Sequence, residues 1–149
     1  MTRIDFYVLP GAEPRERHLT ACRLAEKAYR LGHRCYIQTA SERDDTVLDD
    51  LLWTFRQGSV LPHAVWRGGP DSGLPVLLGN VPPPDFLDEV LIHLADPIPD
   101  AYDRFHRVVE IVDADEETRE AARRRFRFYR ERGLSPATHQ LTGSEDSPR

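Results

Sequence analysis

The residues of this chain best suited to bind a ligand are arginines near its C-terminus. The segment 119–132, REAARRRFRFYRER, holds seven arginines and two glutamates, a net charge of +5 in a chain whose formal net charge is -5. The rest of the chain therefore carries a net charge of -10. A basic segment on an acidic body attracts acidic partners to one place. The chemistry that it predicts is the binding of an acidic partner.

Helical spacing concentrates this charge further. At about 100° per residue, one face of the predicted helix carries Arg119, Arg123, Arg127 and Arg130. The neighbouring stripe, which we expect to face the core, consists of Thr118, Ala122, Phe126 and Tyr129. An aromatic ring beside guanidinium groups suits a short acidic peptide with an apolar end residue. The alternative is an arginine face that is only solvated and binds nothing. Part of the charge pattern then serves helix stability, because acidic residues at the start of a helix and basic residues at its end interact favourably with the helix dipole.

The composition indicates one soluble domain. The chain has 149 residues, of which 40% are apolar and 30% charged. No apolar run approaches the roughly 20 residues that a membrane span needs, and strand-like sequence begins at once where a signal peptide would lie. We therefore expect a cytoplasmic protein without a membrane partner. The two cysteines, Cys22 and Cys35, are predicted to be buried thiols, since two cysteines make neither a disulfide framework nor a zinc site.

Helices and strands alternate in the order that an α/β fold requires. Apolar runs predict strands at 3–9, 34–39, 75–79, 90–94 and 107–112, and helical periodicity predicts helices at 14–31 and 42–55 before the basic one. The segment 56–73 is rich in glycine and proline and is predicted to be a loop. We expect a three-layer, Rossmann-like α/β domain over residues 1–140, with a mostly parallel sheet flanked by helices. Residues 141–149 are expected to form a disordered tail.

The motifs of nucleotide and hydrolytic sites are missing. There is no G-x-x-x-x-G-K-[ST], no G-x-S-x-G, and no G-x-G-x-x-G after the first strand, where the turn reads Pro10-Gly11-Ala12-Glu13. The six histidines lack metal-ligand spacing; His93 is predicted to be a bonded core residue, and His63 has no evident catalytic partner. The acid pairs 44–45 and 49–50 are expected to cover an exposed helix face. We predict no functional nucleotide site, no catalytic or metal-binding residue and no cofactor.

A second, apolar feature lies in the middle of the chain. Around the predicted helix, Trp53 falls almost opposite the buried stripe, on the polar face between Asp49 and Asp50. It either packs under the following loop or contacts a partner. The nearby run Val60-Leu61-Pro62-His63 is an apolar patch within the turn-rich segment.

Four stretches together resemble a known family. They are the opening strand 5–9 (DFYVL), the segment 48–53 (LDDLLW) followed by 60–63 (VLPH), the strand 108–112 (VVEIV), and the helix 122–130 (ARRRFRFYR) ending at Gly133. In order and spacing, over residues 3–140, the chain resembles the chi subunit of the bacterial DNA polymerase III holoenzyme. The leucine-tryptophan helix with its Leu-Pro-His turn and the basic-aromatic helix are the most specific parts of this resemblance.

The resemblance implies a non-catalytic adaptor of DNA replication within the clamp-loader assembly. Chi-like proteins have a Rossmann-like fold without a working nucleotide site. They pair with the psi subunit and bind the acidic C-terminal tail of single-stranded DNA-binding protein, which ends in Pro-Phe. The family also suggests a DNA helicase as a competing partner of the psi-binding surface. No direct contact with nucleic acid is expected.

The resemblance also assigns residues. Arg123 and Arg127 would meet the acidic residues and terminal carboxylate of the tail, with Arg130 at the rim, and Phe126 with Val112 would line the pocket for its phenylalanine. The psi contact would use Phe55, Val60, Leu61 and Pro62, and Trp53 could serve either surface. Arg125, which projects near the core stripe, and the proline-rich segment 81–84 receive no role.

Two other functions remain open from the residues alone. The arginine helix could hold single-stranded nucleic acid directly, because basic and aromatic side chains together bind such strands; the charge of -10 elsewhere opposes this. A degenerate nucleotide-binding enzyme would instead need a ligand pocket at the carboxyl ends of the strands.

Overall fold

The computed structural model describes residues 1–142 of the chain. Seven strands, three α-helices and one short 3-10 helix follow one another in this part. In chain order they are β1 (Arg3–Val8), α1 (Pro14–Arg30), β2 (Cys35–Gln38), α2 (Glu42–Thr54), β3 (His63–Val65), β4 (Val76–Gly79), β5 (Val90–His93), the 3-10 helix (Tyr102–Arg104), β6 (Arg107–Val112), α3 (Glu116–Glu131) and β7 (Ala137–Gln140). The predicted disordered tail falls largely on residues 143–149, which lie outside this description.

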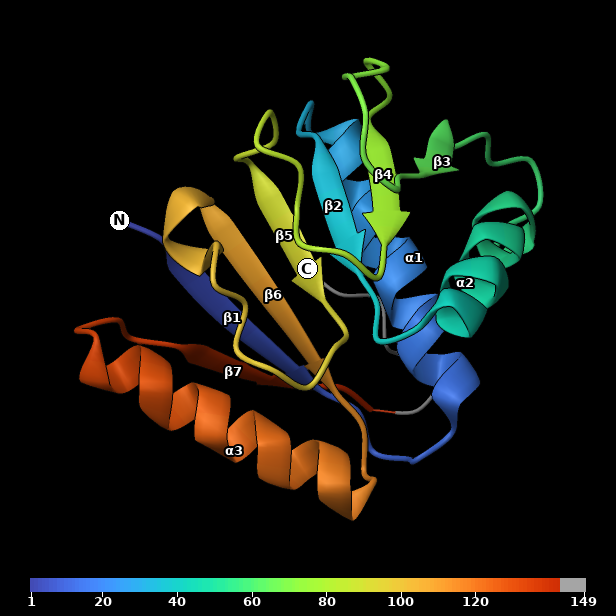
Figure 1. The fold of residues 1–149 in the computed structure, drawn as a ribbon. Helices are drawn as coiled ribbons and strands as arrows, with labels where there is room; N and C mark the ends of the chain where they lie inside the picture. Colours follow the sequence, from blue (N-terminus) through green and yellow to red (C-terminus); the bar gives the residue numbers. More distant parts are fainter. Residues whose placement is uncertain (143–149) are drawn as a thin grey trace.

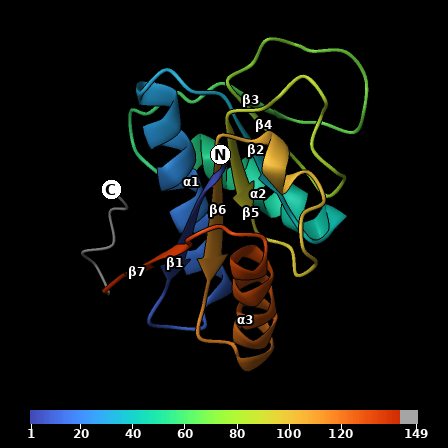
Figure 2. The same ribbon diagram turned by 90° about the vertical axis from the view of Figure 1, so that its left-hand side faces the viewer.

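All seven strands form one sheet in the order β3-β4-β2-β5-β6-β1-β7. Every strand pair in it is parallel. Helices α1 and α2 cover one face of this sheet, and α3 covers the other face over β6, β1 and β7 (Figures 1 and 2). The prediction of a three-layer, Rossmann-like α/β domain is confirmed. No helix among residues 1–142 combines the length and apolarity of a membrane span.

Local sequence signals set where the helices begin. Helix α1 starts at Pro14, which suits a first turn because its missing N–H would be unbonded there in any case. The Ser41 side chain accepts a hydrogen bond from the Asp44 N–H at the start of α2, and Asp115 accepts one from the Thr118 N–H at the start of α3. These caps fix the direction in which each helix leaves its strand.

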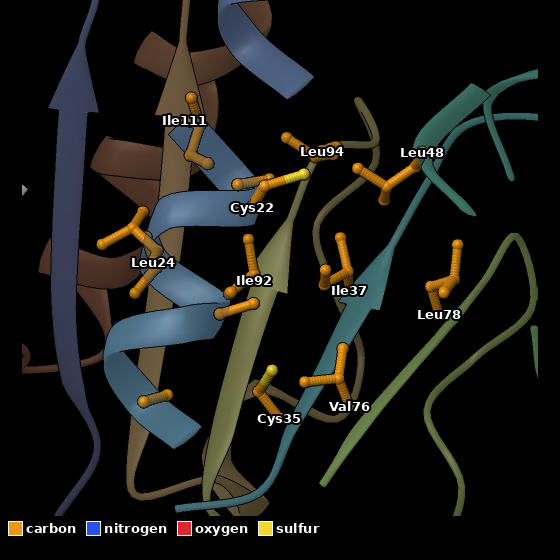
Figure 3. Packing of buried hydrophobic residues seen from close by; sticks show 14 of the residues in the cluster. Cys22, Leu24, Cys35, Ile37, Leu48, Val76, Leu78, Ile92, Leu94 and Ile111 are labelled. Atoms are coloured by element: carbon orange, nitrogen blue, oxygen red, sulfur yellow. The ribbon is translucent and has the colours of Figure 1, made fainter. Parts of the chain in front are cut away.

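The face beneath α1 and α2 forms the larger apolar core. Figure 3 shows Ile37, Leu78 and Ile92 from three neighbouring strands directed toward the helices. The predicted burial of both cysteines is confirmed, since Cys22 and Cys35 are free thiols inside this core. Burial raises the pKa of each thiol to about 12, so neither forms a reactive thiolate near neutral pH.

Two strands are absent from the sequence prediction. The loop prediction for 56–73 is wrong at β3, a short edge strand that pairs with β4. Strand β7 follows Gly133, where no periodicity indicates a strand, and it pairs with β1 at the other edge. Both edge strands bury little apolar surface, so neither shows the hydrophobic alternation that identifies a strand in sequence.

Candidate functional site

A cavity of about 200 Å³ lies where the chain changes sides of the sheet. Strand β1 leads to α1 on one face, whereas its neighbour β6 leads to α3 on the other (Figure 1). Open α/β sheets bind ligands at the carboxyl ends of strands at such a point. The lining residues are Phe6 and Val8 of β1, Val112 of β6, Thr138 of β7, and Arg119, Ala122, Arg123 and Phe126 of α3.

The cavity combines an apolar floor with a cationic side. The ring centroids of Phe6 and Phe126 lie 5.3 Å apart, and these rings form part of the floor. The Arg119 guanidinium donates to the carbonyl oxygens of Asp113 (3.1 Å) and Leu9 (3.4 Å), which hold it beside the opening. The volume is below the roughly 300–1,000 Å³ of drug-sized sites. It suits one large apolar side chain next to an anionic group.

Arg123 is half exposed and already has acidic neighbours on its own helix. Its Nη1 lies 2.8 Å from Glu120 Oε2 and 3.7 Å from Glu116 Oε1. These carboxylates are themselves exposed, so the ion pairs are weak and exchange readily with solvent or with another anion. The guanidinium can therefore turn toward an acidic ligand at little cost.

Three of the five residues predicted for tail binding come together in this cavity: Val112, Arg123 and Phe126. Arg127 and Arg130 are exposed on α3 and do not line it. Four further residues line the cavity that the sequence pattern did not indicate: Phe6, Val8, Arg119 and Thr138. Arg119 could have been assigned from the sequence, because it shares the helical face of Arg123. The other three residues belong to strands that only the order of the sheet brings next to α3.

Arg125 is the most deeply buried charge of α3. Its side chain is 1% exposed, its Nε donates to Glu110 Oε1 (3.0 Å) and its Nη1 donates to the Asp96 carbonyl oxygen (2.8 Å). The Tyr129 hydroxyl donates to Glu110 Oε2 (2.7 Å), and His93 Nδ1 lies 2.7 Å from Oε1. These four side chains, Glu110, Arg125, Tyr129 and His93, form a buried network that ties α3 to β5 and β6.

This buried network explains the positions of Arg125 and His93. Arg125 holds α3 on the sheet, and His93 is a core residue whose Nδ1 is hydrogen-bonded, as predicted. Burial alone would raise the pKa of Glu110, but the His93 and Arg125 charges and the hydrogen bonds to it outweigh burial and lower the pKa to about 2. The carboxylate is therefore ionised at neutral pH.

The apolar turn next to α2 lies on the opposite side of the molecule. Trp53 is 55% exposed and Val60 75% exposed, whereas Leu61 is only 1% exposed and belongs to the core. Phe55 and Pro62 are half-buried. The Trp53 ring lies 4.2 Å from the His63 ring by centroids, so it packs beside the turn and also remains available to a partner.

His63 has structural partners. Its Nδ1 lies 2.7 Å from the Leu61 carbonyl oxygen, and its Nε2 lies 3.1 Å from the Asp49 carbonyl oxygen and 3.2 Å from Asp49 Oδ1. Both ring nitrogens thus fasten the turn to α2. This arrangement fixes the position of the exposed Val60 and Trp53 side chains relative to each other.

A second cavity, of about 470 Å³, lies at the carboxyl ends of β2, β4 and β5. Pro82 and Pro83 of the unassigned proline-rich segment line it, and the Val81 carbonyl oxygen accepts from the Tyr36 hydroxyl (2.7 Å). The two charged side chains of its lining are the carboxylates Asp96 and Asp100. They would repel phosphate groups, so this cavity does not favour a nucleotide.

One prediction about the paired acids is wrong. Asp45 is fully buried and accepts a hydrogen bond from the Thr39 hydroxyl, whereas the sequence placed it on an exposed face. Burial raises its pKa, and the Thr39 hydrogen bond only partly offsets this. Thr39 follows directly after β2, so its contact with Asp45 depends on how the strand packs against α2. Helical periodicity within α2 alone could not indicate this contact.

The fold and the first cavity define a Rossmann-like α/β protein with a small cavity that is apolar on its floor and cationic at one side. In a comparison with known proteins, residues 1–137 match the family described as DNA polymerase III chi subunit, HolC. The chain belongs to this family of replication accessory subunits. The resemblance identified from the sequence is thereby confirmed.

Relatives support this membership along almost the whole chain. The chain is 43% identical over 141 residues to the DNA polymerase III subunit chi of Pseudomonas aeruginosa, covering 95% of this chain and 98% of that protein. It is 29% identical over 115 residues to the Escherichia coli subunit chi, covering 76% and 78%. Identity to the Haemophilus influenzae subunit chi is 25% over 138 residues, covering 92% and 96%.

Proposed function

We propose that this chi-family protein is a non-catalytic adaptor of the clamp-loader assembly in the cytoplasm. Its α3 cavity binds the acidic C-terminal tail of single-stranded DNA-binding protein, and its Trp53–Val60 surface binds the psi subunit. The protein thereby links psi to protein-coated single-stranded DNA. A DNA helicase can occupy the Trp53–Val60 surface in place of psi.

The observation that carries tail binding is the pairing of an apolar floor with arginines in one small cavity. A terminal phenylalanine places a ring and a carboxylate within a few ångströms of each other. The ring suits the floor of Phe6 and Phe126, and the carboxylate suits Arg119 and Arg123 at the side. Further along α3, Arg127 and Arg130 are exposed toward the acidic residues that precede the phenylalanine.

The two surfaces permit both partners at once. Helices α2 and α3 pack in separate apolar clusters on opposite faces of the sheet, so a tail on α3 does not collide with a partner beside Trp53 (Figure 1). The psi surface is supported by two large apolar side chains that the fold leaves exposed, Trp53 and Val60. Leu61 supports this surface from the core, and its side chain does not reach a partner.

The test is fluorescence anisotropy with a labelled acidic peptide that ends in Asp-Ile-Pro-Phe. We expect wild type to bind, and Arg123→Ala to weaken binding at least about tenfold, because a charge-assisted hydrogen bond contributes roughly 1.5–3 kcal/mol. Arg124→Ala is the matched control, since Arg124 is similarly exposed on α3 but does not line the cavity. Equal losses in both variants would show only a general charge effect.

Two further binding measurements distinguish tail binding from direct binding of single-stranded DNA. A peptide ending in alanine instead of phenylalanine should lose most of its affinity, because the cavity floor is left empty. Labelled single-stranded DNA without its binding protein should not bind at the same salt concentration. Binding of the DNA, with no binding of the peptide, would replace the adaptor by a direct nucleic-acid-binding module.

A further inference from the structure

Strand β7 leaves one edge of the sheet open among the residues that the structure describes. Leu141 N–H donates to the Val8 carbonyl oxygen (2.9 Å), so residues 137, 139 and 141 direct their backbone groups toward β1. Successive residues of a strand direct these groups to opposite sides. The N–H and C=O groups of Thr138 and Gln140 therefore point outward, away from β1.

This open edge is continuous with the α3 cavity. Thr138 lies beside Phe6 in the β1–β7 register, and both side chains line the cavity. An extended peptide bound along β7 would therefore have the cavity beside it. Main-chain pairing of this kind is a common way to hold an extended peptide, with side-chain pockets adding selectivity.

Helix α3 presents charge along the same edge. On the helix, Arg119, Arg123 and Arg130 lie on the flank that includes the cavity residues, whereas Phe128 lies on the other flank and contacts Tyr102 (5.4 Å between ring centroids). Because α3 connects two parallel strands, it runs opposite to β7 (Figure 1). Arg119 and Arg123 thus lie toward the carboxyl end of β7, and Arg130 toward its amino end.

We propose that the acidic tail adds to the sheet as a further strand, parallel to β7, with its terminal side chain in the α3 cavity. This inference rests on the tail binding proposed above and specifies its mode. The parallel direction follows from the positions of the arginines, because the terminal carboxylate belongs near Arg119 and Arg123. Seven helical residues separate Arg123 from Arg130, about 10 Å, which an extended peptide spans in about three residues. An acidic residue four positions before the phenylalanine therefore faces Arg130, because it lies on the same side of the added strand as the phenylalanine and the long arginine side chain covers the remaining distance.

A series of peptides with a single backbone N-methyl group tests this mode. Methylation is placed in turn at each of the four residues before the proline, which removes one N–H and leaves every side chain unchanged. A strand directs alternate N–H groups toward its neighbour. We expect alternate positions to weaken anisotropy-measured binding by roughly threefold to tenfold, as for loss of one hydrogen bond, and the positions between them to change it less than about twofold.

The outcomes separate this inference from the function that it rests on. A flat response along the methylated series, with normal binding of the unmodified peptide, would overturn the added strand and leave tail binding in place. Failure of the unmodified peptide to bind would overturn both. The series leaves the protein unchanged, so its result does not depend on the folding of a variant.

A protein variant provides an independent arm. Gln140→Pro removes one outward N–H without removing a hydrogen bond to β1, and an edge strand accepts proline at such a position. We expect the variant to bind the unmodified peptide roughly threefold to tenfold more weakly. Gln140→Ala is the control, because it removes the side chain and keeps the N–H. Equal affinity of the two variants, with both folded by circular dichroism, would contradict the pairing.

Discussion

The two faces of the sheet bury their side chains by different means. Under α1 and α2, residues such as Ile37 and Leu78 pack against apolar helix residues. Under α3, the apolar cluster also surrounds an ionised carboxylate, Glu110, with Arg125 held against it. A buried ion pair contributes little net stability, because both charges lose their hydration. The first face therefore holds the domain together, whereas the second fixes one position of α3 on the sheet.

The largest effect should come from breaking the charged face. Glu110→Gln keeps the shape of the side chain but leaves the Arg125 guanidinium buried without a carboxylate. We expect the free energy of unfolding to fall by about 3–5 kcal/mol, measured by urea denaturation. Ile37→Val on the apolar face should cost only about 0.5–1.5 kcal/mol.

Glu131→Gln is the matched control, because it makes the same substitution at an exposed glutamate of α3, the helix that carries Arg125. It should change the free energy of unfolding by less than about 0.5 kcal/mol. A Glu110→Gln variant as stable as Glu131→Gln would contradict the buried network and would remove the distinction between the two faces.

The stability that Glu110 contributes should depend on pH. The pKa of Glu110 is lowered in the folded protein from 4.5 to about 2. Its contribution is therefore complete above about pH 4.5 and is lost as the pH falls through about 2, because the unfolded state binds the proton first. Wild type and Glu110→Gln should differ most near pH 7 and converge on acidification. The pKa of Asp5 is also lowered, but Asp5 is present in both proteins and cancels in the difference between their free energies of unfolding. A difference that stays constant down to pH 2 would contradict this role of Glu110.

The smallest effect on stability is expected outside both cores. Trp53→Ala removes a half-exposed ring that contacts His63 and should cost about 1 kcal/mol or less. The same change should weaken psi binding by more than about 2 kcal/mol, as for the aromatic centre of an interface, in calorimetric titration. Affinity for the tail peptide should stay unchanged. Val47→Ala, at another exposed apolar position of α2, is the control and should not affect psi binding.

The sequence predicted the inner strands and the helices because each carries its own periodic signal. The five predicted strands and the first two helices lie within one residue of the expected bounds, and the basic helix begins three residues before the segment 119–132. Strands β3 and β7 could not be found in this way, because an exposed edge strand such as Ala137–Gln140 has no apolar side to repeat. The β7 strand matters for the site, since it provides Thr138.

The site itself was predictable only where its residues share one element. Arg123 and Phe126 fall on the same flank of α3, so helical spacing was sufficient to join them. Phe6 and Val8 are more than 100 residues away in sequence and approach α3 only through the sheet order. The burial of Arg125 depends on Glu110 in the neighbouring strand β6, which a helical projection of α3 alone does not include.

The position of β1 has a consequence for the order of synthesis. This strand is made first, yet its neighbours in the sheet are made last: Arg3 lies beside Arg107 in β6, and Asp5 lies beside Ala137 in β7. A growing chain must keep its first strand unpaired until almost the whole domain has left the ribosome. The α3 cavity takes residues from Phe6 to Thr138, so it forms only after translation has passed β7. A chain terminated before Thr138 would lack the cavity and, under the proposed function, would not compete with finished molecules for the tail.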